Sequence, residues 1–196
     1  MVEILEASYQ AGARGIEAIP IGSIIEACRI MVETYKDYIV TGSTYPGRES
    51  GIEDLMKVEA KIIFVHGMIS DMKDRKLIHL LEEVKSRGAI PGIATHEPLS
   101  TINYAIDNSL NVRAFLIPFN ALGEFMGNNV KDLEKLVDNT NNYHFIGMKT
   151  LAAGRLDPIT AYEYIAKHNI CSVTIGMVTP EEAMISTKTA IEKLSK

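Results

Sequence analysis

Two histidines stand where parallel α/β proteins usually place their catalytic side chains. His66 closes the apolar run KIIFVHG (61–67), and His96 closes IPGIATH (90–96). If these runs are neighbouring parallel strands, about 4.8 Å apart, the two imidazoles lie roughly 5–10 Å from each other. That separation suits an acid–base pair or two ligands of one metal ion. The alternative is that each histidine is only hydrogen-bonded to its own loop.

Two charged residues fall inside apolar strand-like runs. Lys149 lies in HFIGMKT, where burial would lower its pKa and make it a candidate Schiff-base nucleophile or proton donor. Glu17 lies in GIEAIP and alternates with apolar neighbours, so it is a candidate base. If a metal ion is bound, Glu17 would join His66 and His96 as a ligand. The simpler alternative is an ion pair between Lys149 and Glu17.

Other polar residues at strand ends are candidates for holding a substrate. The loop TGSTYPGRES (41–50) offers hydroxyl donors and, in Arg48, a clamp for an anion. Asn120 ends the run RAFLIPFN and could orient a substrate oxygen. The predicted substrate-binding residues are Thr41, Ser43, Tyr45 and Asn120.

Two glycine-bearing turns near the C-terminus could bind a phosphate or a cofactor. LAAGRLDP contains Gly154 and Arg155, and IGMVTPEE contains Gly176. In barrels, backbone N–H groups and a helix N-terminus at this place often bind phosphate. Glu181 and Glu182 follow directly, however, and would repel an anion if they faced it.

These residues are set in a repeating order of short apolar runs and amphipathic helices. The predicted strands are 15–20, 38–43, 61–67, 90–96, 113–120, 144–150 and 172–177, preceded by a helix at 2–10. The runs are continuously apolar, which indicates a parallel sheet buried on both faces. We therefore expect one α/β domain over 1–196, a TIM-type (β/α)8 barrel lacking its first strand. An open doubly wound sheet is the alternative, but no GxGxxG follows the first strand.

The net charge, the hydropathy and the cysteine content limit the kinds of partner and the location that we expect. The net charge is −5 without a block of like charges, so we expect no nucleic-acid partner. No apolar run reaches the ~20 residues of a membrane span, and the N-terminus has no secretion signal. The two cysteines fit a reducing compartment, so a cytoplasmic location is expected. A missing strand would leave two open sheet edges, which predicts a homo-oligomer.

The C-terminal run GMKTLAAGRLDPITAYEYIAKHNICSVTIGMVTPEEAMISTKTAIEKL (147–194) resembles the end of the aldo/keto reductases. His66 also falls on the strand that carries the catalytic histidine of that family. The resemblance implies an NADP-dependent oxidoreductase with the nucleotide at Gly154 and Gly176. The family's aspartate, tyrosine and lysine have no counterparts in PIGSI (20–24) or VTGST (40–44).

The run ASYQAGARGIEAIP (7–20) is similar instead to xylose-isomerase-like barrels. That resemblance implies a divalent metal held by carboxylates and histidines, for which Glu17, His66, His96 and Glu97 are available.

The leading expectation is an aldo/keto-reductase-like enzyme acting on a small carbonyl or polyol compound, with or without a phosphate group. Three alternatives stay open: a metal-dependent isomerase or lyase, a Schiff-base lyase using Lys149, and a barrel that binds a ligand without catalysis. The apolar loop 121–129, with Leu122, Phe125 and Met126, is a candidate lid.

Overall fold

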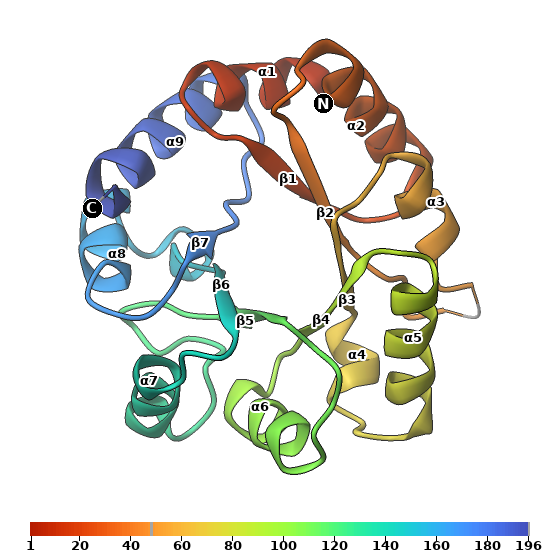
Figure 1. Cartoon of the computed structure of the whole chain (residues 1–196). Helices are drawn as coiled ribbons and strands as arrows, with labels where there is room; N and C mark the ends of the chain where they lie inside the picture. Colours follow the sequence, from red (N-terminus) through yellow and green to blue (C-terminus); the bar gives the residue numbers. More distant parts are fainter. Residues whose placement is uncertain (48, 196) are drawn as a thin grey trace.

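The computed structural model describes residues 1–47 and 49–195 and contains one parallel sheet of seven strands in sequence order. Arg48, the predicted anion clamp, lies outside the described residues. The sheet curls into a nearly closed ring with the helices outside it (Figure 1). The strands are β1 (Gly15–Ala18), β2 (Ile39–Ser43), β3 (Ile62–Val65), β4 (Ile90–Ala94), β5 (Ala114–Pro118), β6 (His144–Met148) and β7 (Ser172–Val173).

Helices follow the strands in the expected alternation. They are α1 (Val2–Gln10), α2 (Gly22–Thr34), α3 (Ile52–Lys57), α4 (Gly67–Ser70), α5 (Arg75–Ser86), α6 (Pro98–Asp107), α7 (Val130–Asn139), the short 3-10 helix η1 (Ala152–Gly154), α8 (Pro158–Ile165) and α9 (Pro180–Leu194). Within the described residues β1 and β7 pair with one neighbour each and not with one another. The expected TIM-like barrel without one strand is therefore confirmed, and the doubly wound sheet is wrong.

Alternating residues of each strand build two apolar layers. One layer, between sheet and helices, includes Ile63, Phe115 and Phe145. The other points into the ring and includes Phe64 and Leu116. The parallel register pairs Glu17 with Thr41, Thr41 with Ile62, and Ser43 with Phe64. Glu17, Thr41 and Ser43 therefore share the inward face with Phe64, and the lumen is polar at β1 and β2 and apolar along β3, β4 and β5.

The last strand is shorter than its sequence run predicts. Only Ser172 and Val173 form β7, and Thr174 donates one more backbone hydrogen bond of 2.8 Å to Gly147. A barrel strand normally has a neighbour on each side, whereas β7 has only β6. With half the usual ladder bonds to hold it, the chain leaves the sheet early.

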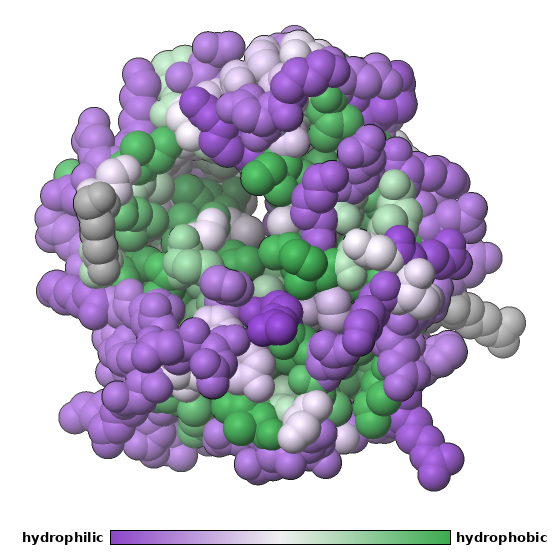
Figure 2. All heavy atoms as spheres, in the orientation of Figure 1, coloured by the Kyte–Doolittle hydropathy of each residue, from purple (hydrophilic) through white to green (hydrophobic). Residues whose placement is uncertain are grey.

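Helices close the ring where the sheet is open. α1 packs along α9 (Figure 1), so close that a Cβ on Gly12 would lie 2.4 Å from Cδ1 of Ile191. Gly12 has a φ of +114°, which also favours glycine. Figure 2 shows a hollow near the middle of this view, with apolar residues along much of its wall. No helix among the described residues is long and apolar enough to cross a membrane.

Candidate active site

His66 is held rigidly at the carboxyl end of β3. Its backbone N–H donates to Oγ1 of Thr44 at 3.0 Å, and its Nδ1 accepts from the N–H of Met68 at 3.1 Å. The second bond makes His66 the N-cap of the short helix α4. Because Nδ1 accepts a hydrogen bond, the neutral ring carries its proton on Nε2.

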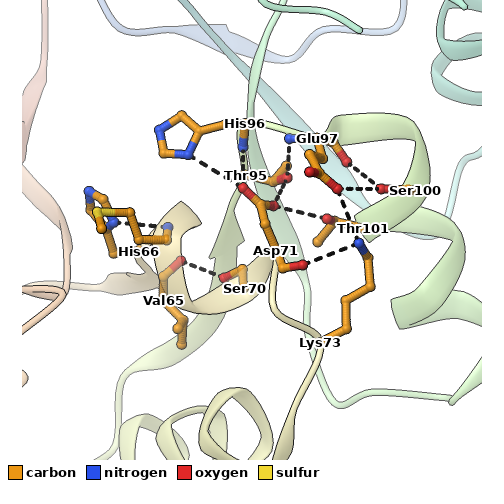
Figure 3. Close-up of polar contacts among 11 residues, drawn as sticks. Val65, His66, Ser70, Asp71, Lys73, Thr95, His96, Glu97, Ser100 and Thr101 are labelled. Carbon is orange, nitrogen blue, oxygen red and sulfur yellow. Dashed lines mark hydrogen bonds and ion pairs between the residues drawn. The ribbon is translucent and has the colours of Figure 1, made fainter.

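The two histidines meet as the strand spacing predicts. The ring centroids of His66 and His96 are 5.8 Å apart, with the rings edge to face (Figure 3). The absence of a side chain at Gly67 makes this possible, since a Cβ there would lie 2.4 Å from Nδ1 of His96. The structure thus brings together the central pair of the predicted catalytic residues.

Asp71, which sequence reasoning missed, anchors His96. Its side chain is 15% exposed, and Oδ2 accepts from the backbone N–H of His96 at 2.9 Å while lying 3.4 Å from Nδ1 of the ring. Its Oδ1 accepts from the hydroxyls of Thr95 and Thr101. Figure 3 shows the carboxylate between these groups. Four contacts to a buried carboxylate fix the backbone and the ring of His96 together.

A second ion pair lies beside Asp71 at the start of α6. Nζ of Lys73 lies 3.3 Å from Oε2 of Glu97, and the same ammonium donates to the backbone carbonyl of Asp71 at 3.3 Å. Ser100 donates to Oε2 of Glu97 at 3.2 Å (Figure 3). This pair ties the end of α4 to the first turn of α6, so the loops that carry both histidines are held to one another.

Burial and the neighbouring imidazole set the protonation of His66. Burial lowers the pKa of His66 from its ordinary value of 6.5, and repulsion by a charged His96 lowers this pKa further, while Asp71 opposes both effects. At neutral pH His66 is therefore an uncharged ring whose Nε2–H can donate a hydrogen bond. Neutral histidines of this kind can polarise a carbonyl oxygen.

Glu17 lies on the inward face and is hydrogen-bonded to Ser43 on the neighbouring part of that face. Its Oε1 accepts from the hydroxyl of Ser43 at 2.5 Å, and burial raises the pKa of Glu17 from 4.5. The hydroxyl of Thr41 donates to the carbonyl of Ile16 at 3.2 Å. Over residues 1–47 and 49–195, no group of three or more His, Cys, Asp or Glu side chains is placed to hold a metal ion. The predicted metal site of Glu17, His66 and His96 thus has no support from the geometry.

Lys149 is not paired with Glu17. Within the described part of the chain no carboxylate lies within 4.0 Å of its Nζ, which sits 4.1 Å from the centroid of the Phe125 ring. Burial lowers the pKa of this lysine. Lys149 also has a φ of +54°, in the left-handed region. Because its pKa is lowered and its Nζ lies on an aromatic face, Lys149 is still a candidate nucleophile.

Asn120 organises the loop that was predicted to be a lid. Its Nδ2 donates to the carbonyls of Glu124 and Lys149, at 2.9 and 3.2 Å, and its Oδ1 accepts from the N–H groups of Leu122 and Glu124. These four bonds use the whole hydrogen-bonding capacity of the amide. Asn120 therefore positions the loop and leaves no free group for a substrate, while Tyr45 is half exposed in its own loop.

The two glycine turns leave room for a phosphate but lie beside little free positive charge. Gly154, with a φ of +82°, and Gly176 both have open space at the Cβ position. Arg155, however, is 2.6 Å from a carboxylate oxygen of Glu124. At the start of α9, a cavity of about 330 Å³ is lined by Thr179, Glu181, Glu182, Ile185 and Ser186. Two acidic side chains there oppose a phosphate, and Arg155, in the other turn, is already paired with Glu124.

Known structures resemble the whole chain. A Pseudomonas aeruginosa protein assigned as an aldo-keto reductase superposes with a TM-score of 0.72 at 12% identity, over 99% of this chain and 83% of that one. The aldo-keto reductase AKR11C1 of Bacillus halodurans, in its holo form, gives 0.71 at 11% identity, over 96% and 80%. The chain therefore has the same barrel fold as these aldo-keto reductase structures. No protein-family model matches the sequence, and no curated protein matches it significantly.

Two further structures bear on chemistry. A variant of Gox0644 in complex with NADPH superposes with a TM-score of 0.70 at 12% identity, over 100% of this chain and 79% of that one. The 2-keto-3-deoxy-6-phosphogluconate aldolase of Zymomonas mobilis, with 3-phosphoglycerate, gives 0.62 at 18% identity, over 96% and 83%. At these identities the likeness establishes the fold and not the reaction.

Proposed function

We propose that this protein acts on a small carbonyl or polyol compound at the carboxyl end of its barrel, with His66 and His96 moving a proton to or from the carbonyl oxygen. The observation that carries the proposal is the histidine pair, 5.8 Å apart between ring centroids and fixed by Thr44, Met68 and Asp71. Such a pair matches the usual requirements for general acid–base catalysis.

The geometry supports different roles for the two rings. His66 is neutral and donates from Nε2, which suits it to polarise a carbonyl oxygen and to supply the proton that the product alcohol or enol retains. His96 is 44% exposed and lies beside Asp71, so it can exchange a proton with solvent. In this arrangement a proton taken up from solvent by His96 replaces the one that His66 has donated.

Carbonyl reduction is the reaction class with the best support from related folds. The likeness to aldo-keto reductases, and to a Gox0644 variant in complex with NADPH, supports an oxidoreductase. The acidic start of α9 argues against a nucleotide phosphate at that position. In such a reaction His66 is the proton donor.

A lyase that forms a Schiff base is the second candidate. The specific observation in its favour is Lys149, whose pKa is lowered by burial and whose nearest described partner is an aromatic ring. Incubation with dihydroxyacetone or pyruvate and borohydride, followed by peptide mass analysis, would trap the adduct at Lys149. An unmodified Lys149 would exclude this candidate for those carbonyls.

The proposed function is tested with D-glyceraldehyde, D-erythrose and D-xylose as substrates. Oxidation of NADPH reports reduction, and loss of the α-proton signal in D2O reports proton transfer without a cofactor. We expect one of these activities, and we expect His66→Asn to lower it by about 100-fold or more. His144→Asn is the matched control, because His144 is exposed at the opposite end of β6. Equal loss in both variants, or activity in neither assay with the wild type, would contradict the proposal.

A further inference from the structure

A groove beside His96 has no role in the proton transfer described above. It has a volume of about 540 Å³ and lies between the first turn of α6 and the loop that precedes α7. The lining residues are His96, Glu97, Pro98, Leu99, Ser100, Asn103, Met126, Gly127, Asn128 and Asn129. Its volume is in the range of small-molecule sites.

We propose that this groove binds the hydroxylated, uncharged chain of a sugar-like compound whose carbonyl group lies at the histidine pair. The assignment rests on the proposed function and adds the class of substrate. Its floor is apolar, with Pro98 and Met126 buried. Its rim carries neutral amides and a hydroxyl, from Asn103, Asn128 and Ser100, which both donate and accept hydrogen bonds as sugar hydroxyls require.

The charge of the groove selects against phosphate. A helix N-terminus normally attracts an anion, but the residue before α6, Glu97, places a negative charge beside the groove. Lys73 and Ser100 hold its Oε2 at 3.3 and 3.2 Å. None of the residues that line the described groove is a lysine or an arginine. A phosphorylated ligand would meet Glu97 without a free cation to offset it, whereas an uncharged polyol would not.

The position of His96 connects the groove to the chemistry. Its ring belongs both to the groove lining and to the pair with His66. A ligand in the groove therefore lies beside His96, whose ring is 5.8 Å from that of His66 between centroids. The exposed fraction of the His96 ring, 44%, leaves it open to such a ligand.

The test compares D-erythrose with D-erythrose 4-phosphate, which differ only in the phosphate. Binding is measured on the full chain by calorimetry and by saturation-transfer NMR. We expect the wild type to bind D-erythrose at least about tenfold more tightly than D-erythrose 4-phosphate. Asn103→Leu should weaken this binding about tenfold through loss of hydrogen bonds, and Asn111→Leu, in the exposed loop after α6, should leave it unchanged. Glu97→Gln should raise the affinity for the phosphorylated compound.

Three results would overturn the assignment: tighter binding of the phosphorylated compound by the wild type, no binding of D-erythrose, or an equal effect of Asn103→Leu and Asn111→Leu. The outcome is separable from that of the proposed function. Binding that depends on Asn103 without turnover would support the groove and contradict the acid–base role of His66. Turnover that depends on His66 but is unchanged in Asn103→Leu would support the acid–base role of His66 and contradict the assignment of the groove.

Discussion

A Cβ atom on Gly67 would lie 2.4 Å from Nδ1 of His96, a separation that real side chains do not tolerate. Gly67 begins α4 immediately after His66, so the residue that follows one histidine makes room for the other. The backbone of Gly67 is helical, and alanine fits that conformation without strain. Gly67 is therefore needed for the placement of the imidazole and not for the turn itself.

This contact predicts the effect of Gly67→Ala. The half-exposed ring of His96 can rotate toward solvent, so the melting temperature should change little while activity falls by about 100-fold, as expected for a misplaced catalytic group. Activity assays and histidine NMR would check this. Gly22→Ala is the control, since Gly22 starts α2 with open space at its Cβ position. Unchanged activity in Gly67→Ala would show that His96 is not required.

Asp71→Asn should destabilise the fold as well as the site. The carboxylate accepts from two threonine hydroxyls and from the backbone of His96, and an amide can replace only part of these bonds. We expect a loss of about 1–3 kcal/mol in the free energy of unfolding, measured by urea denaturation. Asp54→Asn, which removes an exposed ion pair with Lys57, should cost less than about 1 kcal/mol. Equal costs would contradict the anchoring role of Asp71.

The lowered pKa of His66 predicts a pH dependence of stability. Below pH 6.5 the unfolded chain binds a proton at this residue more readily than the folded chain does. Stability should therefore be fully present above about pH 6.5 and fall as the pH decreases toward the folded pKa. Urea denaturation at pH 5, 6 and 7 should show a smaller decrease for His66→Asn than for the wild type. An identical slope would indicate that His66 is not desolvated.

Glu17 should affect stability with the opposite pH dependence, and Glu17→Gln should remove this effect. The pKa of Glu17 is raised in the folded protein, so stability is greatest below its ordinary value of 4.5 and is lost as the pH rises through the folded pKa. A glutamine carries no charge to bury and can still accept from Ser43. The variant should be more stable than the wild type at pH 7 and equal to it near pH 4. Glu192→Gln, on the exposed surface of α9, should show no such difference.

The open edges of β1 and β7 still predict that the protein forms a homo-oligomer. Each of these strands is paired on one side only in the described chain. Unpaired strand edges tend to recruit another chain. Light scattering at micromolar concentration should give a mass above the 21.6 kDa of one chain. A clean mass of one chain would contradict the prediction.

The sequence by itself determined the order of strands and helices and the meeting of His66 with His96. Both follow from local rules: apolar runs form the strands, capped amphipathic segments form the helices, and adjacent parallel strands bring their carboxyl ends together. The cap residues Asp157 and Thr179 are examples, since each accepts the backbone bond that its position predicts. The missing strand was visible in the same way, because the chain contains seven strand-like runs.

Apart from the meeting of the two histidines, the side-chain contacts of the site were decided by the tertiary structure. Asp71 lies in a polar stretch without periodic signal, and only the packing of α4 against β4 brings its carboxylate to His96. Asn120 ends a strand as a substrate ligand would, yet its four bonds run to the loop and to Lys149. The sequence was compatible with an ion pair between Lys149 and Glu17, but in the structure Lys149 lies over the ring of Phe125. Backbone periodicity follows from neighbours along the chain, whereas such contacts depend on ångström-scale packing between distant segments, which no local pattern encodes.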